Sequence, residues 1–173
     1  MLAPAKAARL RLMGFDVDGV LTDGTLYFGA QGDEMKAFSC VDGHGLKMLA
    51  AAGIVPAIVS GRRSAAVERR VAELGIELVR LGVADKRAAM RELLDGAGLE
   101  FAQAGYMGDD VVDLPLMRAC GFCATVPAGH ALLKRHADYV AAAGGGRGAA
   151  REVCEFILKA QGRLDAALAE WLQ

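Results

Sequence analysis

Residues 14–24 have the sequence GFDVDGVLTDG, which places three aspartates directly after the first apolar run of the chain. Carboxylates this close repel one another, and burial adds a desolvation cost for each ionised group. Such a cluster is tolerated in a folded protein when cationic side chains or a metal ion lie beside it. We therefore take residues 14–24 as the first candidate for a functional site and as the starting point for the fold.

The rest of the chain alternates short apolar runs with amphipathic segments. The runs predict strands at 10–15, 54–60, 76–82, 102–108, 121–126 and 139–140. The amphipathic segments predict helices at 45–52, 62–75, 85–97, 113–120 and 149–161, followed by a helical tail. Residues 24–39 predict a β-hairpin whose turn is GAQGD.

Strands that alternate with helices form βαβ units, so we expect an α/β fold with a Rossmann-like, doubly wound and mainly parallel sheet. The 173 residues fit one domain, spanning 1–173, with the hairpin as an insert.

Composition argues against several classes of protein. The net charge is -1 and no long basic run occurs, so we expect no nucleic-acid or membrane partner. No apolar stretch is long enough to cross a bilayer, and the N-terminus lacks a signal-like apolar region. We therefore expect a cytoplasmic protein.

Polar residues follow four of the predicted strands, at the edge where ligands bind in parallel sheets. Any one of these residues alone would be interpreted as a turn former, a helix cap or a solvated charge. Their joint occurrence at successive strand ends indicates a single site. They are Asp16 and Asp18, then Ser60, Gly61 and Arg62, then Lys86, and last Asp109, Asp110 and Asp113.

The chemistry of these groups suits phosphoryl transfer. Converging carboxylates favour Mg²⁺, which prefers oxygen ligands, while a lysine and a hydroxyl suit phosphate oxygens. A carboxylate can act as the nucleophile and form an aspartyl phosphate. A second acid two residues along the chain can protonate the leaving alkoxide and then activate water.

Four segments, DVDGVLTDG, IVSGR, Lys86 and GDDVVDLP, resemble the four motifs of the haloacid dehalogenase superfamily of phosphohydrolases, and the resemblance covers nearly the whole chain. Within that superfamily the chain is most similar to small phosphatases that act on 3-deoxy-D-manno-octulosonate 8-phosphate (KDO 8-phosphate). Three further segments carry this similarity: the helix after KAFSCVDGHG, HADYV, and GGGRGAAREVCEFIL.

The resemblance implies a role for each aspartate of the motifs. Asp16 would be the nucleophile and a Mg²⁺ ligand. Asp18 would be the general acid/base, with its backbone carbonyl on the metal. Asp109 would be the third protein ligand, while Asp110 and Asp113 would orient the metal-bound waters and the loop.

The remaining motif residues would serve the phosphate and the substrate. Ser60 and Lys86 would hold the phosphate, and Lys86 would also offset the carboxylate charge. Gly61 lets the backbone approach, and Arg62 reaches toward the substrate. Asp23 lies beyond this loop, and we interpret it as a turn residue that pairs with backbone N–H groups.

The residues that would bind the sugar-acid part of the substrate belong to no single motif. Val41 stands where many similar proteins carry a basic residue, and His44 where bulkier residues are common, which leaves the identity of the sugar acid open. Arg147, in the GGGRG segment, is either a contact for the substrate carboxylate or part of a flexible connector. The candidate substrate-binding residues are Asp18, Ser39, Cys40, Val41, Asp42, Gly43, Lys47, Gly61, Arg62, Arg70, Lys86 and Arg147.

The stretch 22–56 is too short for a cap domain with its own core, so we expect none. The subgroup that the chain resembles is tetrameric, with hairpins gathered at the subunit interface. Leu26, Tyr27, Phe28 and Phe38 fit such an interface; the alternative is that they pack on their own sheet.

The sequence therefore favours a Mg²⁺-dependent phosphatase that converts KDO 8-phosphate to KDO and phosphate through an aspartyl phosphate, in lipopolysaccharide precursor synthesis. One alternative keeps this mechanism for a nine-carbon, sialic-type sugar acid 9-phosphate. Another is a receiver-like phospho-acceptor module for signalling, although the D-x-D pair precedes the lysine here, whereas receivers carry their phosphorylated aspartate alone in mid-chain.

Overall fold

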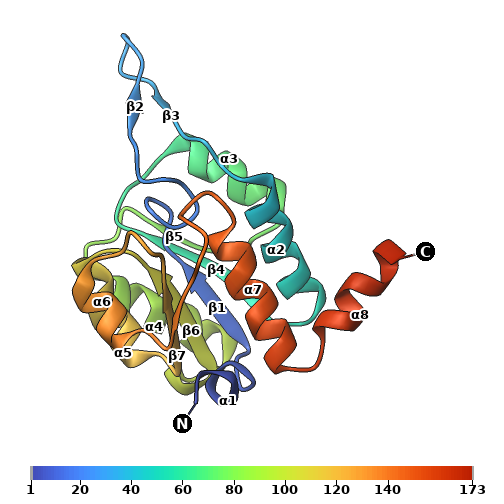
Figure 1. Ribbon diagram of the computed structural model, residues 1–173. Helices are drawn as coiled ribbons and strands as arrows, with labels where there is room; N and C mark the ends of the chain where they lie inside the picture. Colours follow the sequence, from blue (N-terminus) through green and yellow to red (C-terminus); the bar gives the residue numbers. More distant parts are fainter. Residues whose placement is uncertain (1, 173) are drawn as a thin grey trace.

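The structure is a computed structural model that describes residues 2–172, and its centre is a six-stranded sheet in which every strand pair is parallel (Figure 1). The strands are β1 (Leu12–Phe15), β4 (Val55–Ser60), β5 (Leu78–Leu81), β6 (Ala104–Gly108), β7 (Phe122–Thr125) and β8 (Tyr139–Val140). Their order is β5-β4-β1-β6-β7-β8, so the chain builds outward from β1 first on one side and then on the other. The predicted α/β class with a mainly parallel sheet is confirmed.

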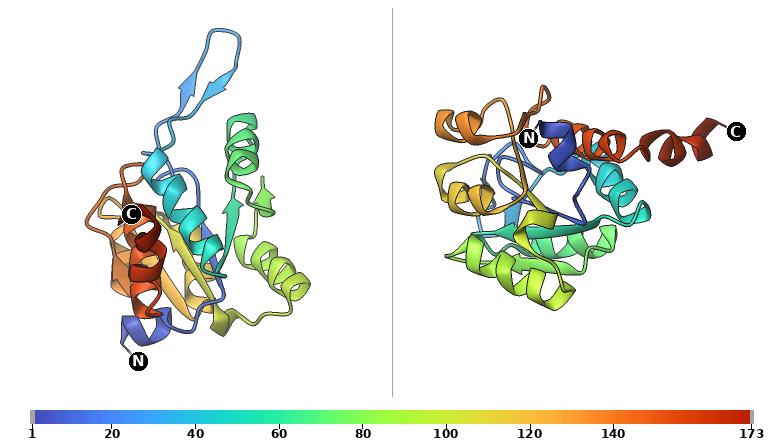
Figure 2. Two further views of the ribbon diagram at one scale, coloured as in Figure 1. Left: turned by 90° about the vertical axis from the view of Figure 1, so that its right-hand side faces the viewer. Right: turned by 90° about the horizontal axis from the view of Figure 1, so that it is seen from below.

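Helices cover both faces of the sheet (Figure 2). One face packs against α1 (Ala3–Ala7), α2 (Cys40–Ala51), α3 (Ala65–Leu74) and α7 (Ala149–Ala160). The other face packs against α4 (Lys86–Ala97), α5 (Leu114–Ala119) and α6 (Ala131–His136). The chain continues into α8 (Leu164–Ala169), and short 3-10 helices occupy Phe101–Gln103, Val111–Asp113 and Glu170–Leu172. Within residues 2–172, none of these helices is long and apolar enough to cross a membrane.

Most elements begin and end close to their predicted positions, but α2 starts five residues earlier than the predicted 45. The Ser39 hydroxyl accepts a hydrogen bond from the Asp42 backbone N–H and so caps an additional turn. Gly45 lies inside this helix, where an added Cβ would stand 3.0 Å from the Arg151 Cα. Gly45 is therefore a point at which α2 and α7 approach closely. The short helices α1 and α6 were not predicted.

A hairpin formed by β2 (Tyr27–Phe28) and β3 (Glu34–Met35) projects from the carboxyl-terminal edge of the sheet (Figure 1). The chain between β1 and β4 consists of a loop, this hairpin and α2, so no separate cap domain is present there, as predicted. Phe38, at the base of the hairpin, packs against the core of its own chain. Tyr27 and Phe28 are exposed, Phe28 to 63 %.

Asp42, which the sequence suggested as a substrate contact, has a structural role instead. Its side chain is buried, and its two oxygens accept hydrogen bonds from the backbone N–H groups of Gly148 (3.1 Å) and Arg151 (2.9 Å). These N–H groups belong to the first turn of α7, where no helical carbonyl can satisfy them and where the helix dipole favours a negative charge. Asp42 therefore joins the start of α2 to the start of α7.

Replacing Asp42 with alanine should lower the free energy of unfolding by roughly 1–3 kcal/mol, because two N–H groups at the start of α7 lose their acceptor. Urea unfolding followed by circular dichroism measures the change. Asp95→Ala, which removes an exposed carboxylate paired with Arg91 on α4, is the matched control and should change stability by less than about 0.5 kcal/mol. Equal effects of the two substitutions would contradict the capping role.

Candidate active site

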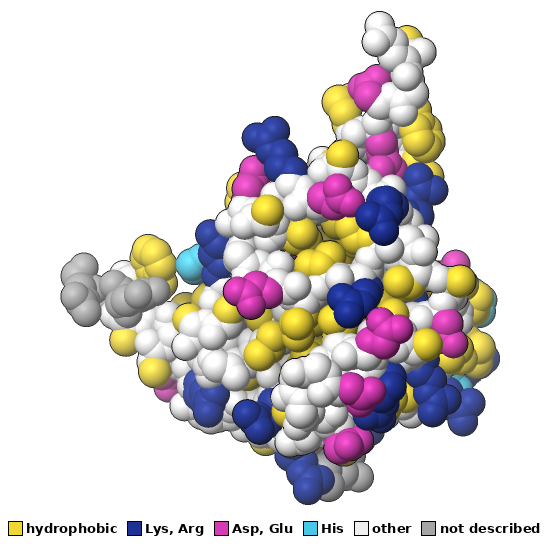
Figure 3. Space-filling view, turned by 180° about the vertical axis from the view of Figure 1, so that it is seen from behind, with side chains coloured by type: hydrophobic (Ala, Val, Ile, Leu, Met, Phe, Trp, Pro, Cys, Tyr) yellow, Lys and Arg dark blue, Asp and Glu magenta, His cyan; other side chains and the backbone are white. Residues whose placement is uncertain are grey.

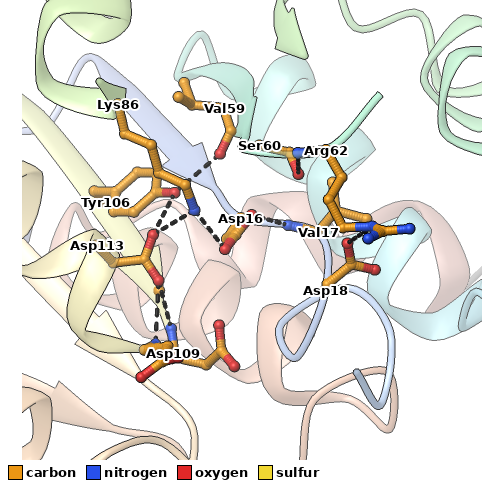
Figure 4. Close-up of polar contacts among 12 residues, drawn as sticks. Asp16, Val17, Asp18, Val59, Ser60, Arg62, Lys86, Tyr106, Asp109 and Asp113 are labelled. Atoms are coloured by element: carbon orange, nitrogen blue, oxygen red, sulfur yellow. Dashed lines mark hydrogen bonds and ion pairs between the residues drawn. The ribbon is translucent and has the colours of Figure 1, made fainter. Parts of the chain in front are cut away.

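The carboxyl ends of β1, β4 and β6 and the start of α4 meet around one cavity of about 270 Å³ (Figure 4). This position follows from the topology, because β1 is the strand from which the chain adds β4 and β5 on one side and β6 to β8 on the other. The cavity brings together residues predicted from four separate segments. It is lined by Asp16, Asp18, Gly24, Ser60, Gly61, Arg62, Lys86, Asp109, Asp110 and Val112.

Lys86 is the central cation of the site. Its Nζ lies 2.6 Å from Asp16 Oδ2 and 2.6 Å from Asp113 Oδ1, and all three side chains are buried. Burial acts to lower the pKa of Lys86, but the two carboxylates outweigh it and the pKa is raised. The lysine therefore carries its positive charge in the folded protein and holds two carboxylates in fixed positions.

Asp113 holds the loop after β6. Its Oδ2 accepts the backbone N–H groups of Asp109 (3.0 Å) and Asp110 (3.2 Å). Its Oδ1, besides pairing with Lys86, lies 3.1 Å from the Tyr106 hydroxyl. Asp113 is fully buried and, unlike Asp16 and Asp109, does not line the cavity, so we assign it to support of the site rather than to a metal, although its carboxylate lies close to theirs.

Asp16 and Asp109 are the carboxylates best placed for a metal ion. Oxygens of Asp16, Asp109 and Asp113 all lie within 4.8 Å of one another. Burial, then the charge of Asp113, raises the pKa of Asp16 to about 6 despite the opposing effect of Lys86. Burial, then Asp16 and Asp113, raises the pKa of Asp109 to about 7. One lysine does not compensate for this crowding, and the oxygen donors fit a hard divalent cation such as Mg²⁺.

Glycines allow the backbone to pass close to the clustered carboxylates. Gly19 has φ +87°, and a Cβ on it would stand 2.1 Å from an Asp109 carboxylate oxygen. Gly145, in the glycine-rich segment, packs so closely on this loop that its Cβ would stand 1.9 Å from the Gly19 carbonyl oxygen. The Gly146 N–H donates to the Val20 carbonyl at 2.9 Å. The GGGRG segment therefore forms a support behind the loop after β1.

Asp18 points in a different direction from Asp16. Figure 4 shows the Asp16 carboxylate turned toward Lys86 and the Asp18 carboxylate turned toward Arg62. Asp18 Oδ2 lies 3.7 Å from Arg62 Nε, and Oδ1 pairs with Lys36, which follows β3 of the hairpin. Sequence reasoning did not identify Lys36. The available signal was its position two residues after Glu34, which places both side chains on the same face of an extended chain.

Asp23 is confirmed as a turn residue. Its carboxylate accepts the Thr25 backbone N–H at 2.9 Å and is exposed to solvent. This hydrogen bond lowers the pKa of Asp23. The charge of the Arg147 guanidinium lowers it further, by a smaller amount. Gly146, the neighbour of Arg147, packs against the backbone of Thr22 and Asp23, so Arg147 lies near the start of the hairpin.

Several residues predicted to contact the sugar lie outside this cavity. Arg70 packs on Gly43 and donates to the Ser39 carbonyl at 3.3 Å, so it ties α3 to the start of α2. Lys47 lines a separate hollow of about 450 Å³ between α2 and α8. Cys40 and Val41 are exposed in the first turn of α2. Of the predicted substrate contacts, the cavity itself contains Asp18, Gly61, Arg62 and Lys86.

Known proteins are similar to this chain over most of their length. No family model matches the chain. The 3-deoxy-D-manno-octulosonate 8-phosphate phosphatase KdsC of Escherichia coli K12 is 44% identical over 163 residues, covering 94% of this chain and 87% of its own.

Two solved structures extend the comparison. The 3-deoxy-D-manno-octulosonate 8-phosphate phosphatase of Moraxella catarrhalis, in complex with magnesium ion, phosphate ion and KDO, is 43% identical with a TM-score of 0.95, covering 98% of this chain and 97% of its own. A hydrolase of the HAD superfamily, subfamily III A, from Legionella pneumophila is 39% identical with a TM-score of 0.94, covering 98% and 93%. The chain belongs to the 3-deoxy-D-manno-octulosonate 8-phosphate phosphatase family of the haloacid dehalogenase superfamily.

Proposed function

We propose that this protein is a Mg²⁺-dependent phosphatase that hydrolyses KDO 8-phosphate to KDO and phosphate. The observation that carries the proposal is the Asp16–Lys86–Asp113 cluster at the end of β1, with Asp18 and Asp109 beside it. The likeness to an enzyme that holds magnesium, phosphate and KDO supports the choice of cofactor and substrate.

Asp16 is the nucleophile in this mechanism. Its backbone N–H donates to the Met107 carbonyl, and its carboxylate is fixed by Lys86 on one oxygen and by the Val17 N–H, at 2.7 Å, on the other. An oxygen of Asp16 attacks phosphorus while the bond from phosphorus to the sugar oxygen breaks. Asp18 in its protonated form gives its proton to that leaving oxygen, which avoids an unstable alkoxide, and becomes a carboxylate.

Hydrolysis of the aspartyl phosphate reverses the role of Asp18. Its carboxylate, now deprotonated, takes a proton from a water molecule that attacks phosphorus, and the Asp16 carboxylate leaves. Ser60 and the Gly61 backbone line the same cavity and supply donors for the phosphate oxygens, while Lys86 keeps its charge beside Asp16.

The metal would be held by Asp16, Asp109 and the backbone carbonyl of Asp18. When bound, Mg²⁺ supplies positive charge next to the phosphoryl group and so offsets the charge that develops during transfer. Asp110 and Asp113 keep the Asp109 loop in place through the hydrogen bonds described above.

The relatives at 44% identity are named for KDO 8-phosphate, so the nine-carbon alternative is not favoured despite Val41 and His44. Membership of a phosphatase family also removes the support for a receiver-like module. We place the activity in lipopolysaccharide precursor synthesis, and we further propose a cytoplasmic location, in keeping with four unpaired cysteines.

We also propose that the enzyme works as a homotetramer. The cavity of about 270 Å³ is open and has no cap domain over it, so a neighbouring subunit is needed to exclude water and enclose the sugar. The projecting hairpin exposes apolar side chains that suit burial between subunits (Figure 3). They are Leu26, Tyr27, Phe28 and Met35.

Asp16→Asn should abolish phosphate release from KDO 8-phosphate, since an amide is a far weaker nucleophile, while leaving the fold intact. Asp23→Asn is the matched control, and we expect it to retain activity to within about threefold because it lies outside the cavity. Measurable turnover by Asp16→Asn would disprove the assigned nucleophile. A wild-type enzyme that released phosphate equally fast from unrelated sugar phosphates would disprove the assigned substrate.

Magnesium binding should weaken as the pH falls. Because the pKa values of Asp16 and Asp109 are raised to about 6 and about 7, protons occupy these ligands in mildly acidic solution and must leave before the metal binds. We expect the apparent Kd to rise by at least about tenfold between about pH 8 and about pH 6, measured by titration calorimetry. An affinity that stays constant over this range would contradict the proposed ligands.

Sedimentation equilibrium should show a tetramer, and Phe28→Asp should shift it to smaller species with lower activity, because a charge would be buried at the interface. Leu2→Asp, which changes an exposed leucine far from the hairpin, should leave the tetramer intact. A monomeric wild-type protein with full activity would rule out closure of the site by a neighbouring subunit.

A further inference from the structure

Four charged side chains form a closed ring between the hairpin and the active site. Lys36 pairs with Asp18 Oδ1 and lies 3.3 Å from Glu34 Oε1. Arg62 lies 3.7 Å from Asp18 Oδ2 through its Nε and 3.1 Å from Glu34 Oε1 through its Nη2. Two cations and two carboxylates thus alternate around the ring. Glu34 and Lys36 come from the hairpin, Asp18 from the loop after β1 and Arg62 from the loop after β4.

Lys36 is the buried member of this ring. Its side chain is 1 % exposed, whereas that of Arg62 is 47 % exposed. A buried ammonium group is tolerated only beside an anion, and Asp18 is the closer of its two carboxylate partners. Because its side chain is covered, Lys36 does not reach into the substrate cavity, and its residue is absent from the cavity lining. A direct contact with the sugar is therefore not its role.

The ion pairs of the ring restrain the position of the Asp18 carboxylate. Asp16 and Asp18 are two residues apart and both border the cavity, yet their carboxylates are held by different lysines, Lys86 and Lys36. This division keeps the nucleophile and the acid/base apart, with separate orientations. Arg62 alone is a weaker restraint on Asp18, since it is half-exposed and its Nε lies 3.7 Å away.

We propose that Lys36 is a positioning residue that orients Asp18 for proton transfer and so makes the acid/base step depend on the placement of the hairpin. The proposal rests on the function proposed above, in which Asp18 protonates the leaving oxygen. The hairpin then has a second role besides subunit contact, because it carries the cation that fixes a catalytic side chain. Displacement of the hairpin would disturb proton transfer without touching the nucleophile or the metal ligands.

Lys36→Met tests the proposal, because it keeps much of the side-chain volume and removes the charge. The proton matters most when the leaving group is a poor one, so two substrates are compared. With KDO 8-phosphate, we expect kcat to fall by about tenfold or more while KM changes by less than about twofold. With p-nitrophenyl phosphate, whose leaving group needs no proton, we expect kcat/KM, which reports the steps up to loss of the leaving group, to fall by less than about threefold.

Lys6→Met is the matched control, since Lys6 is paired with Asp138 at 2.5 Å on a part of the chain remote from the cavity. It should leave both substrates unaffected. Lys36→Arg, which retains the charge, should recover part of the lost activity toward KDO 8-phosphate. If Lys36→Met is insoluble, Lys36→Gln serves for the same comparison.

A double-mutant cycle identifies the route by which Lys36 acts. If it acts through Asp18, Lys36→Met should lower the residual activity of Asp18→Asn by less than about twofold. The proposal is overturned if kcat/KM falls equally for both substrates, if it falls for neither, or if the two substitutions have independent effects. Failure of the proposed function is a separate result: the wild-type enzyme would then not hydrolyse KDO 8-phosphate, and the substrate comparison would be made with another alkyl phosphate.

Discussion

The mutual repulsion of buried carboxylates is the constraint on which the active site depends. A parallel sheet whose strands end at one edge brings Asp16, Asp109 and Asp113 within a few ångströms of each other. Lys86 neutralises part of this charge through two short ion pairs, yet burial and, after it, the neighbouring carboxylates still raise the pKa values of Asp16 and Asp109. The remaining negative charge suits a divalent cation and, through it, a phosphate. Affinity for cofactor and substrate thus arises from the same repulsion that opposes folding.

The surrounding structure holds the carboxylates of the site with different partners. Asp113 gives both oxygens to Lys86, Tyr106 and the backbone of the loop after β6, which leaves Asp109 as the more accessible carboxylate. Asp18 is held by a second set of cations that belongs to the hairpin and to the loop after β4. In the proposed mechanism the hairpin replaces a cap domain in two ways, by offering an apolar surface to neighbouring subunits and by fixing the acid/base.

Much of the fold and of the candidate active site could be predicted from sequence, because both follow from local rules. Alternating apolar and amphipathic segments indicate the parallel sheet, and such a sheet collects residues from strand ends that lie far apart in the chain. Asp42 and Lys36 could not be assigned in this way. The role of Asp42 depends on α7, more than a hundred residues away, and that of Lys36 on the path of a hairpin whose tip is exposed. Arg70 was also predicted to contact the substrate. Its packing on Gly43 could not be foreseen, because no local sequence pattern indicates that contact.

The central claim is that Asp16 takes the phosphoryl group from the sugar. Acid quenching of the enzyme during turnover of KDO 8-phosphate with Mg²⁺, followed by peptide mass spectrometry, tests this most directly. We predict one added phosphoryl group on the peptide that contains Asp16, at an aspartate and not at a serine or histidine. A phosphoryl group on any other residue, or turnover with no phosphorylated peptide at any quench time, would contradict the assignment of Asp16 as the nucleophile.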